Sequence, residues 1–220
     1  MTLSNVSQRS RFAIRRKLVS GMVSGMAVAF SGLPALLAGS KPARAEALAA
    51  ETDMILGNPD AKITVVEYAS MTCPHCAKFH TQSMPAIKKA YLDTGKIKFV
   101  FREFPLDRAA FWGSILARCS GKDRFFGFID LMFKRQNLWA TGSDPMQELI
   151  KLGSLGGVGE AEFKACLADK KLGDGILQTR QTASKKYEIN ATPGFLINGK
   201  KAEGVFDYKT LAAVIDPMLR

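Results

Sequence analysis

Two cysteines lie three positions apart in the stretch Cys73-Pro74-His75-Cys76, and their type and spacing suit redox chemistry. An apolar, β-branched stretch at 63–68 precedes them and a helical pattern begins near Cys73, so the first sulfur should lie at a helix N-terminus. Unpaired backbone N–H groups and the helix dipole stabilise an anion there, which favours the thiolate over the thiol. Because the thiolate is the form that attacks disulfides, the pattern favours dithiol–disulfide exchange.

The neighbours of Cys73 fit the start of a helix. Thr72 can cap the helix, and Pro74 is tolerated in the first turn because the N–H that proline lacks would have no partner there. His75, when protonated, adds positive charge beside the Cys73 sulfur. Each unit by which the pKa of Cys73 falls below the ambient pH stabilises the reduced form by about 1.4 kcal/mol, or about 30 mV for a two-electron couple.

Two other interpretations of the cysteine pair remain open at this point. Cys73, Cys76 and His80 recur at i, i+3 and i+7, so one helical face could offer two sulfurs and a nitrogen to zinc or copper, with one ligand still to be found. An inert structural disulfide is the other interpretation. The strand-then-helix context favours the redox interpretation over both.

The first 45 residues have the pattern of an export signal. Residues 1–17 carry five basic side chains and no acidic one, residues 18–39 are apolar and small, and a small-x-small cleavage pattern ends at Ala45. We therefore expect a signal peptide at 1–45 and a periplasmic protein, with an uncleaved membrane anchor as the alternative. This segment holds seven of the basic residues and lowers the formal net charge from +11 to +4 when removed, so no nucleic-acid partner is expected.

The elements that must position the cysteines follow in the next part of the chain. Residues 46–60 are expected to form a flexible lead-in. A strand at 63–68, a helix from about Cys73 to Leu92 that bends at Pro85, and a strand at 97–103 then form a βαβ unit. Its two strands should be parallel neighbours joined by a right-handed crossover.

The character of the chain changes after this unit. Residues 107–187 show recurring helical spacing of apolar side chains and no convincing strand, which predicts an inserted helical region. Strand character returns at 195–197, Asn198-Gly199 predicts a tight hairpin turn, and 201–205 should be the partner strand. A final helix follows, capped by Asp207.

The tetrapeptide at 73–76, the helical interruption and Thr192-Pro193 before the late hairpin together resemble the DsbA family of bacterial thiol:disulfide interchange proteins, over roughly 57–220. The resemblance implies an α/β thioredoxin fold built from 61–106 and 188–220, with an inserted helical domain at 107–187. It also implies a monomeric enzyme that oxidises unfolded, reduced exported polypeptides and is reoxidised by a DsbB-like, quinone-linked membrane protein. No cofactor or metal is implied, since the dithiol carries the electrons.

The resemblance also assigns roles to individual residues. Cys73 would be the attacking cysteine, Cys76 the buried resolving cysteine and Pro193 a cis-proline that faces the disulfide and binds substrate together with Thr192. Glu67 matches a buried acid of the family that assists proton transfer, although the strand pattern alone would equally allow an exposed side chain.

Two positions depart from the enteric member of the family. Thr192 replaces an aliphatic residue and resembles the isomerase branch, so a disulfide isomerase or reductase kept reduced by a partner stays as an alternative function. A periplasmic metal-binding module is a further one. His80 replaces a second acid and is expected at a partly solvated helix position.

The two remaining cysteines, Cys119 and Cys166, lie on apolar faces of different predicted helices. Buried free thiols would be the default in a reducing compartment, but export reverses that default. We therefore expect a structural disulfide between them, an arrangement that some alphaproteobacterial DsbA-like proteins resemble.

Overall fold

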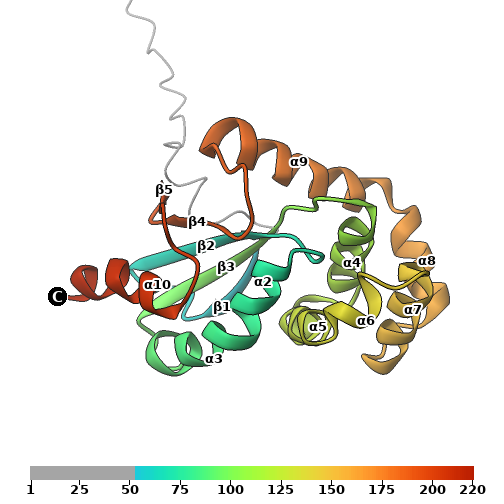
Figure 1. Ribbon diagram of the computed structural model, residues 1–220, viewed down its shortest axis with the longest axis horizontal. Coiled ribbons are helices and arrows are strands. Elements are labelled where there is room, and N and C mark those ends of the chain that lie inside the picture. The colour runs from blue at the N-terminus through green and yellow to red at the C-terminus, as the bar shows by residue number, and fades with distance from the viewer. Residues whose placement is uncertain (1–52) are drawn as a thin grey trace, which may run out of the picture. The chain divides into compact units, whose positions relative to one another are not determined.

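A mixed sheet with strand order β1-β3-β2-β4-β5 forms the centre of the fold (Figure 1). The structure is a computed structural model that describes residues 53–220, so the expected signal peptide at 1–45 lies outside the described residues. Strand β2 pairs in parallel with β3 and antiparallel with β4, while β1 and β5 pair antiparallel at the two edges. The strands are β1 (Met54–Gly57), β2 (Ile63–Ala69), β3 (Ile97–Glu103), β4 (Gly194–Ile197) and β5 (Lys200–Lys201).

The predicted βαβ unit is present. All residues of β2 are buried, as its nearly continuous apolar sequence requires of a central strand. The crossover is one helical run made of α2 (Pro74–Lys78), η1 (Phe79–Ser83), α3 (Met84–Ile87) and η2 (Lys88–Leu92). Pro85 has no N–H to donate to the carbonyl of Thr81, and the π-helical segment η1 ends two residues before it.

The predicted flexible lead-in is wrong for Met54–Gly57, which forms the edge strand β1. Asp53 explains part of this order, because both of its carboxylate oxygens accept hydrogen bonds from the buried Arg102 guanidinium at 2.7 and 2.8 Å. Gly57 ends the strand with φ +88°, and a Cβ there would lie 2.7 Å from Leu92. The strand also covers the backbone edge of β3, which would otherwise be open to other chains.

Residues 107–187, all of which the structure describes, contain helices and no strand. Figure 1 shows α4 to α8 grouped beside the sheet and α9 leading back towards it. The helical region shares one apolar core with the sheet, in which Phe125 of α5 contacts Phe101 of β3. The helices are α4 (Arg108–Cys119), α5 (Lys122–Lys134), α6 (Gln136–Trp139), α7 (Pro145–Leu155), α8 (Glu160–Ala168) and α9 (Lys170–Tyr187).

The C-terminal part follows the predicted order, with a shorter last strand. Asn198 and Gly199 take the positive φ values of a tight hairpin turn, 48° and 79°. The partner strand predicted at 201–205 is limited to Lys200–Lys201, because the chain turns at Gly204 with φ +72°. Asp207 caps α10 (Tyr208–Ile215) through a capping box, and η3 (Asp216–Leu219) follows.

No helix within residues 53–220 is long and apolar enough to cross a membrane.

Candidate active site

Cys73 is the N-cap residue of α2, so its sulfur lies where the sequence predicts. Thr72 does not cap this helix, because its hydroxyl donates to Asp107 at 2.6 Å instead. No side chain caps α2, and backbone N–H groups of its first turn are therefore left to face the Cys73 sulfur. Pro74 occupies the first turn of the helix, as expected.

These surroundings lower the pKa of Cys73 to about 5. The largest cause is a hydrogen bond from the Cys76 thiol; burial opposes it, and the Thr192 side chain and the backbone N–H groups of Cys76 and His75 lower the pKa further. His75 thus acts through its backbone, while its imidazole is exposed. At neutral pH the sulfur is a thiolate, the nucleophilic form.

Cys76 has the opposite character. It is fully buried, and burial, its hydrogen bond to Cys73 and the charge of Glu67 raise its pKa well above the ordinary value. Cys76 therefore keeps its proton at neutral pH and donates it in a hydrogen bond to the Cys73 thiolate. Cys73 is therefore the attacking sulfur, and Cys76 can react only after it has lost its proton.

Thr192 and Pro193 reach the cysteines from the far end of the sequence. Cys73 follows β2 and Thr192 precedes β4, and the antiparallel pairing of Tyr68 with Gly194 brings both to the same edge of the sheet. The Thr192–Pro193 peptide bond is cis. The Cys73 sulfur lies 3.3 Å from the carbonyl oxygen of Thr192, to which the thiol form donates.

A buried hydrogen bond joins Glu67 and His80 close to the cysteines. Glu67, in the middle of β2, is fully buried, and its Oε2 lies 2.7 Å from Nε2 of His80. The expectation of a partly solvated His80 is wrong, because only 5% of this residue is exposed. Its ring stacks on Phe133 at 4.5 Å, and three further phenylalanines contact it edge-on: Phe79, Phe99 and Phe101.

Comparison with known proteins assigns the chain to a family. The family described as Thioredoxin matches residues 49–217. The crystal structure of Wolbachia pipientis alpha-DsbA1 aligns with a TM-score of 0.74 and 33% identity, over 80% of this chain and 96% of that chain. The chain belongs to the thioredoxin family, on its DsbA branch. Its thioredoxin fold with a helical insertion is the one that the sequence predicts.

Two other relatives of this DsbA-family chain come from other bacteria. A Rickettsia bellii protein with the provisional name protein-disulfide oxidoreductase is 40% identical over 76% of this chain and 64% of its own length. The chain thus spans less than two thirds of that relative. Disulfide bond formation protein D of Bacillus subtilis is 27% identical over 76% of this chain and 77% of its own length.

The metal-binding interpretation finds no support in the geometry. Among residues 53–220, no three His, Cys, Asp or Glu side chains are placed to share a metal ion. Of the three candidate ligands, His80 has its Nε2 hydrogen-bonded to Glu67. The helical spacing of Cys73, Cys76 and His80 therefore does not produce a site.

Gln136, at the start of α6, is a supporting residue that the sequence analysis missed. Its side-chain amide donates to the carbonyl oxygens of Met71 and Cys73 at 2.9 and 3.0 Å, both buried contacts. These bonds hold the backbone that leads into α2. No local pattern could have indicated the role, because more than sixty residues separate the partners.

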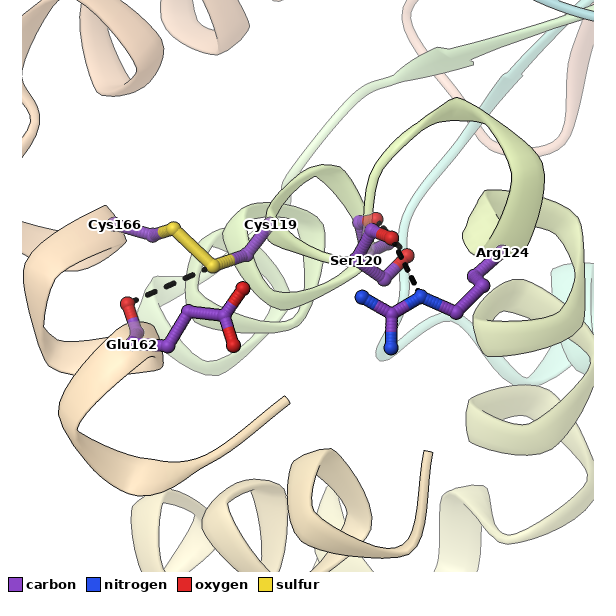
Figure 2. Close-up of a disulfide and its surroundings, with 6 residues drawn as sticks. Cys119, Ser120, Arg124, Glu162 and Cys166 are labelled. Carbon is purple, nitrogen blue, oxygen red and sulfur yellow. Dashed lines mark hydrogen bonds between the residues drawn. A yellow bond between two sulfur atoms is a disulfide. The ribbon is translucent and has the colours of Figure 1, made fainter. Parts of the chain in front are cut away.

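Cys119 and Cys166 are joined by a disulfide that links the end of α4 to α8 (Figure 2). Beside it, Arg124 donates to the carbonyl oxygen of Ser120 at 2.9 Å, and the Cys119 sulfur lies 3.6 Å from the carbonyl oxygen of Glu162. The bridge thus closes a sequence separation of 47 residues inside the DsbA-family helical insertion.

Removal of this bridge should affect stability and leave the active site unchanged. The chain-entropy relation predicts that Cys119→Ala/Cys166→Ala lowers the free energy of unfolding by about 4 kcal/mol. The pKa of Cys73 should stay at about 5, because neither residue contributes to it. Urea denaturation of the oxidised proteins, together with titration of the thiolate absorbance, measures both quantities. A loss below about 1 kcal/mol would contradict the structural role.

Proposed function

We propose that the protein is an exported thiol-disulfide oxidoreductase that introduces disulfide bonds into secreted or periplasmic polypeptides. The difference between its two thiols carries the proposal, because the pKa of Cys73 falls to about 5 while that of Cys76 rises well above its ordinary value. The relatives whose names refer to disulfide chemistry support the same activity.

The reaction transfers two electrons from substrate to enzyme. A substrate thiolate attacks the Cys73 sulfur of the Cys73–Cys76 disulfide, and Cys76 leaves with the electron pair and takes up a proton. The second substrate thiolate then attacks the substrate sulfur of the mixed disulfide, and Cys73 leaves as a thiolate. Its low pKa makes it a good leaving group, so the oxidised substrate is released.

The direction of transfer follows from the same pKa. A pKa about two units below neutral pH stabilises the reduced enzyme by on the order of 3 kcal/mol, or 60 mV, relative to an unperturbed dithiol. A stable reduced form makes the disulfide form oxidising. Net oxidation requires that the dithiol be reoxidised, and we propose a DsbB-like, quinone-linked membrane protein for this step.

Thr192 favours one alternative, an isomerase or reductase that a partner keeps reduced. Its buried hydroxyl has no hydrogen-bond partner among the described residues and lies close enough to Cys73 to lower the pKa of that thiol, so it is available to donate to the thiolate, a form that an isomerase also needs. The redox state of the Cys73–Cys76 pair in cells distinguishes the two functions. Acid quenching followed by alkylation should find mostly the disulfide for an oxidase, and a mostly reduced pair would establish the alternative.

Replacement of Thr192 tests its contribution to the thiolate. Thr192→Val keeps the shape of the side chain and removes the hydroxyl, so the pKa of Cys73 should rise from about 5 towards its ordinary value. The couple should become less oxidising by about 30 mV for each unit of that rise. Thiolate absorbance and equilibration with glutathione measure the two changes. A decrease in the pKa would contradict the role.

A groove of about 780 Å³ beside the cysteines offers a surface for an extended substrate. His75 and Lys78 line it from α2, Thr192 and Pro193 from the loop before β4, and Phe206 from the segment before α10. Phe206 is 61% exposed, so its ring is accessible to a chain bound in the groove. We propose that unfolded polypeptides bind along this groove.

Truncation of Phe206 should weaken substrate binding. Phe206→Ala is expected to raise KM for a reduced, unfolded polypeptide by about three- to tenfold, because one exposed aromatic contact contributes about 1 kcal/mol. The pKa of Cys73 should not change. Leu155→Ala is the matched control, since Leu155 is 69% exposed and does not line the groove. Equal effects of both substitutions would argue against a binding role for the groove.

A further inference from the structure

The buried pair of Glu67 and His80 has an unusual feature. Oε2 of Glu67 is hydrogen-bonded to His80, but Oε1 is buried and has no hydrogen-bond partner among the described residues. A buried carboxylate oxygen without a partner is costly. The pair lies near Cys76, because His80 follows Cys76 by four residues, one turn along the same helical run, and the charge of Glu67 raises the pKa of the Cys76 thiol.

Cys76 needs a proton acceptor in one half of the cycle and a proton donor in the other. It must lose its proton before its sulfur can attack Cys73, and it must regain a proton when it leaves as a thiolate. Because Cys76 is fully buried, bulk water does not reach it. Oε1 of Glu67 accepts no hydrogen bond from the described residues, so it is available to accept this proton.

His80 determines which oxygen of Glu67 is available. A proton on its Nε2 is donated to Oε2 at 2.7 Å, and the four phenylalanines around the ring offer it no competing acceptor. The stacked ring of Phe133 holds the plane of the imidazole. The phenylalanines add no charge, so Cys76 is the titratable group that these contacts bring to the pair of Glu67 and His80.

We propose that His80 is a positioning residue for proton exchange at Cys76, an inference that rests on the proposed dithiol chemistry. His80 holds Glu67 by Oε2, so that Oε1 accepts the proton of Cys76. The Cys76 sulfur then forms a bond to the Cys73 sulfur, the bond from Cys73 to the partner sulfur breaks, and the partner leaves with the electron pair. In the opposite direction, Glu67 returns the proton to the Cys76 thiolate.

The attack of Cys76 on a mixed disulfide between Cys73 and glutathione tests this role. The reaction needs only the two cysteines, so it reports on His80 whether or not exported polypeptides are the true substrates. His80→Phe removes the donor within an aromatic environment and should slow the release of glutathione by about ten- to a hundredfold. It should leave the rate at which iodoacetamide alkylates Cys73 at neutral pH unchanged. His80→Gln, which keeps an N–H donor, should restore most of the rate.

A second comparison covers the case in which His80→Phe does not fold. Glu67→Gln removes the acceptor and should slow the same step. In the Glu67→Gln protein the further change His80→Leu, which removes the donor, should have no effect, because His80 acts through Glu67. The pH dependence of glutathione release should also be altered in both single variants. An unchanged release rate in folded His80→Phe, or equal losses from His80→Leu with and without Glu67→Gln, would overturn the proposal.

Discussion

Cys76→Ala is expected to accumulate covalent complexes with exported proteins in cells, whereas Cys73→Ala should accumulate none. In Cys76→Ala the Cys73 thiolate attacks a disulfide of an exported protein, one sulfur of which leaves as a thiolate. Only that thiolate can then release the mixed disulfide, because the second route, attack by Cys76, is absent, so the complexes persist longer. In Cys73→Ala the remaining active-site sulfur is fully buried, and burial, the largest cause of the raised pKa of Cys76, persists. At neutral pH its thiolate fraction is lower than that of Cys73 by on the order of a hundredfold or more.

Non-reducing electrophoresis after acid quenching measures the complexes, and dithiothreitol should reduce the mixed disulfides and release the bound proteins. The Cys73→Ala/Cys76→Ala protein is the control for disulfides formed through other cysteines. Equal trapping by both single variants would mean that the assignment of attacking and resolving cysteine is wrong. The absence of complexes from Cys76→Ala would contradict the proposed oxidoreductase itself.

The parts of the site that the sequence predicted are those fixed by local pattern. Cys73 precedes a helix because an apolar strand ends shortly before it and Pro74 suits only a first turn, and both facts are visible in a short stretch. The hairpin turn at Asn198 and Gly199 is equally local, since these residues readily take positive φ.

The parts that the sequence did not predict depend on contacts between distant segments. Strand β1 has few residues, and its order comes from pairing with β3 and from the contact of Asp53 with Arg102, about fifty positions away. A histidine on a helix is usually solvated, and His80 is buried because Glu67 and Phe133 meet it from other elements. Such partners are visible only after the chain has folded.

Thr72 is of a residue type that commonly caps helices, but its side chain makes a different contact in the structure. Its hydroxyl could cap α2, but Asp107 at the start of α4 accepts it in a short, charge-assisted hydrogen bond. The loss of the cap has a chemical consequence. The backbone N–H groups that a threonine cap would have occupied instead stabilise the Cys73 thiolate.

The reduced protein should lose stability in acid because of Cys73. The pKa of this thiol is about 5 in the folded protein and about 9 in the unfolded chain. A group whose pKa is depressed on folding stabilises the folded state fully above its unfolded pKa, and this contribution declines as the pH falls to the folded pKa. Between pH 7 and pH 5 the decline should amount to about 2 kcal/mol. The raised pKa of Cys76 opposes stability only in alkaline solution, outside this interval.

Urea denaturation of the reduced protein and of reduced Cys73→Ser at several pH values isolates the effect. Serine does not titrate in this interval, so other groups that both proteins share cancel in the difference between their free energies of unfolding. That difference should narrow as the pH falls from 7 through 5 and become constant below about pH 4. A difference that stays constant from pH 7 to below 5 would mean that Cys73 is not a thiolate at neutral pH. The same thiolate makes the disulfide form oxidising, so the oxidising power of the enzyme relative to glutathione should decrease over the same interval.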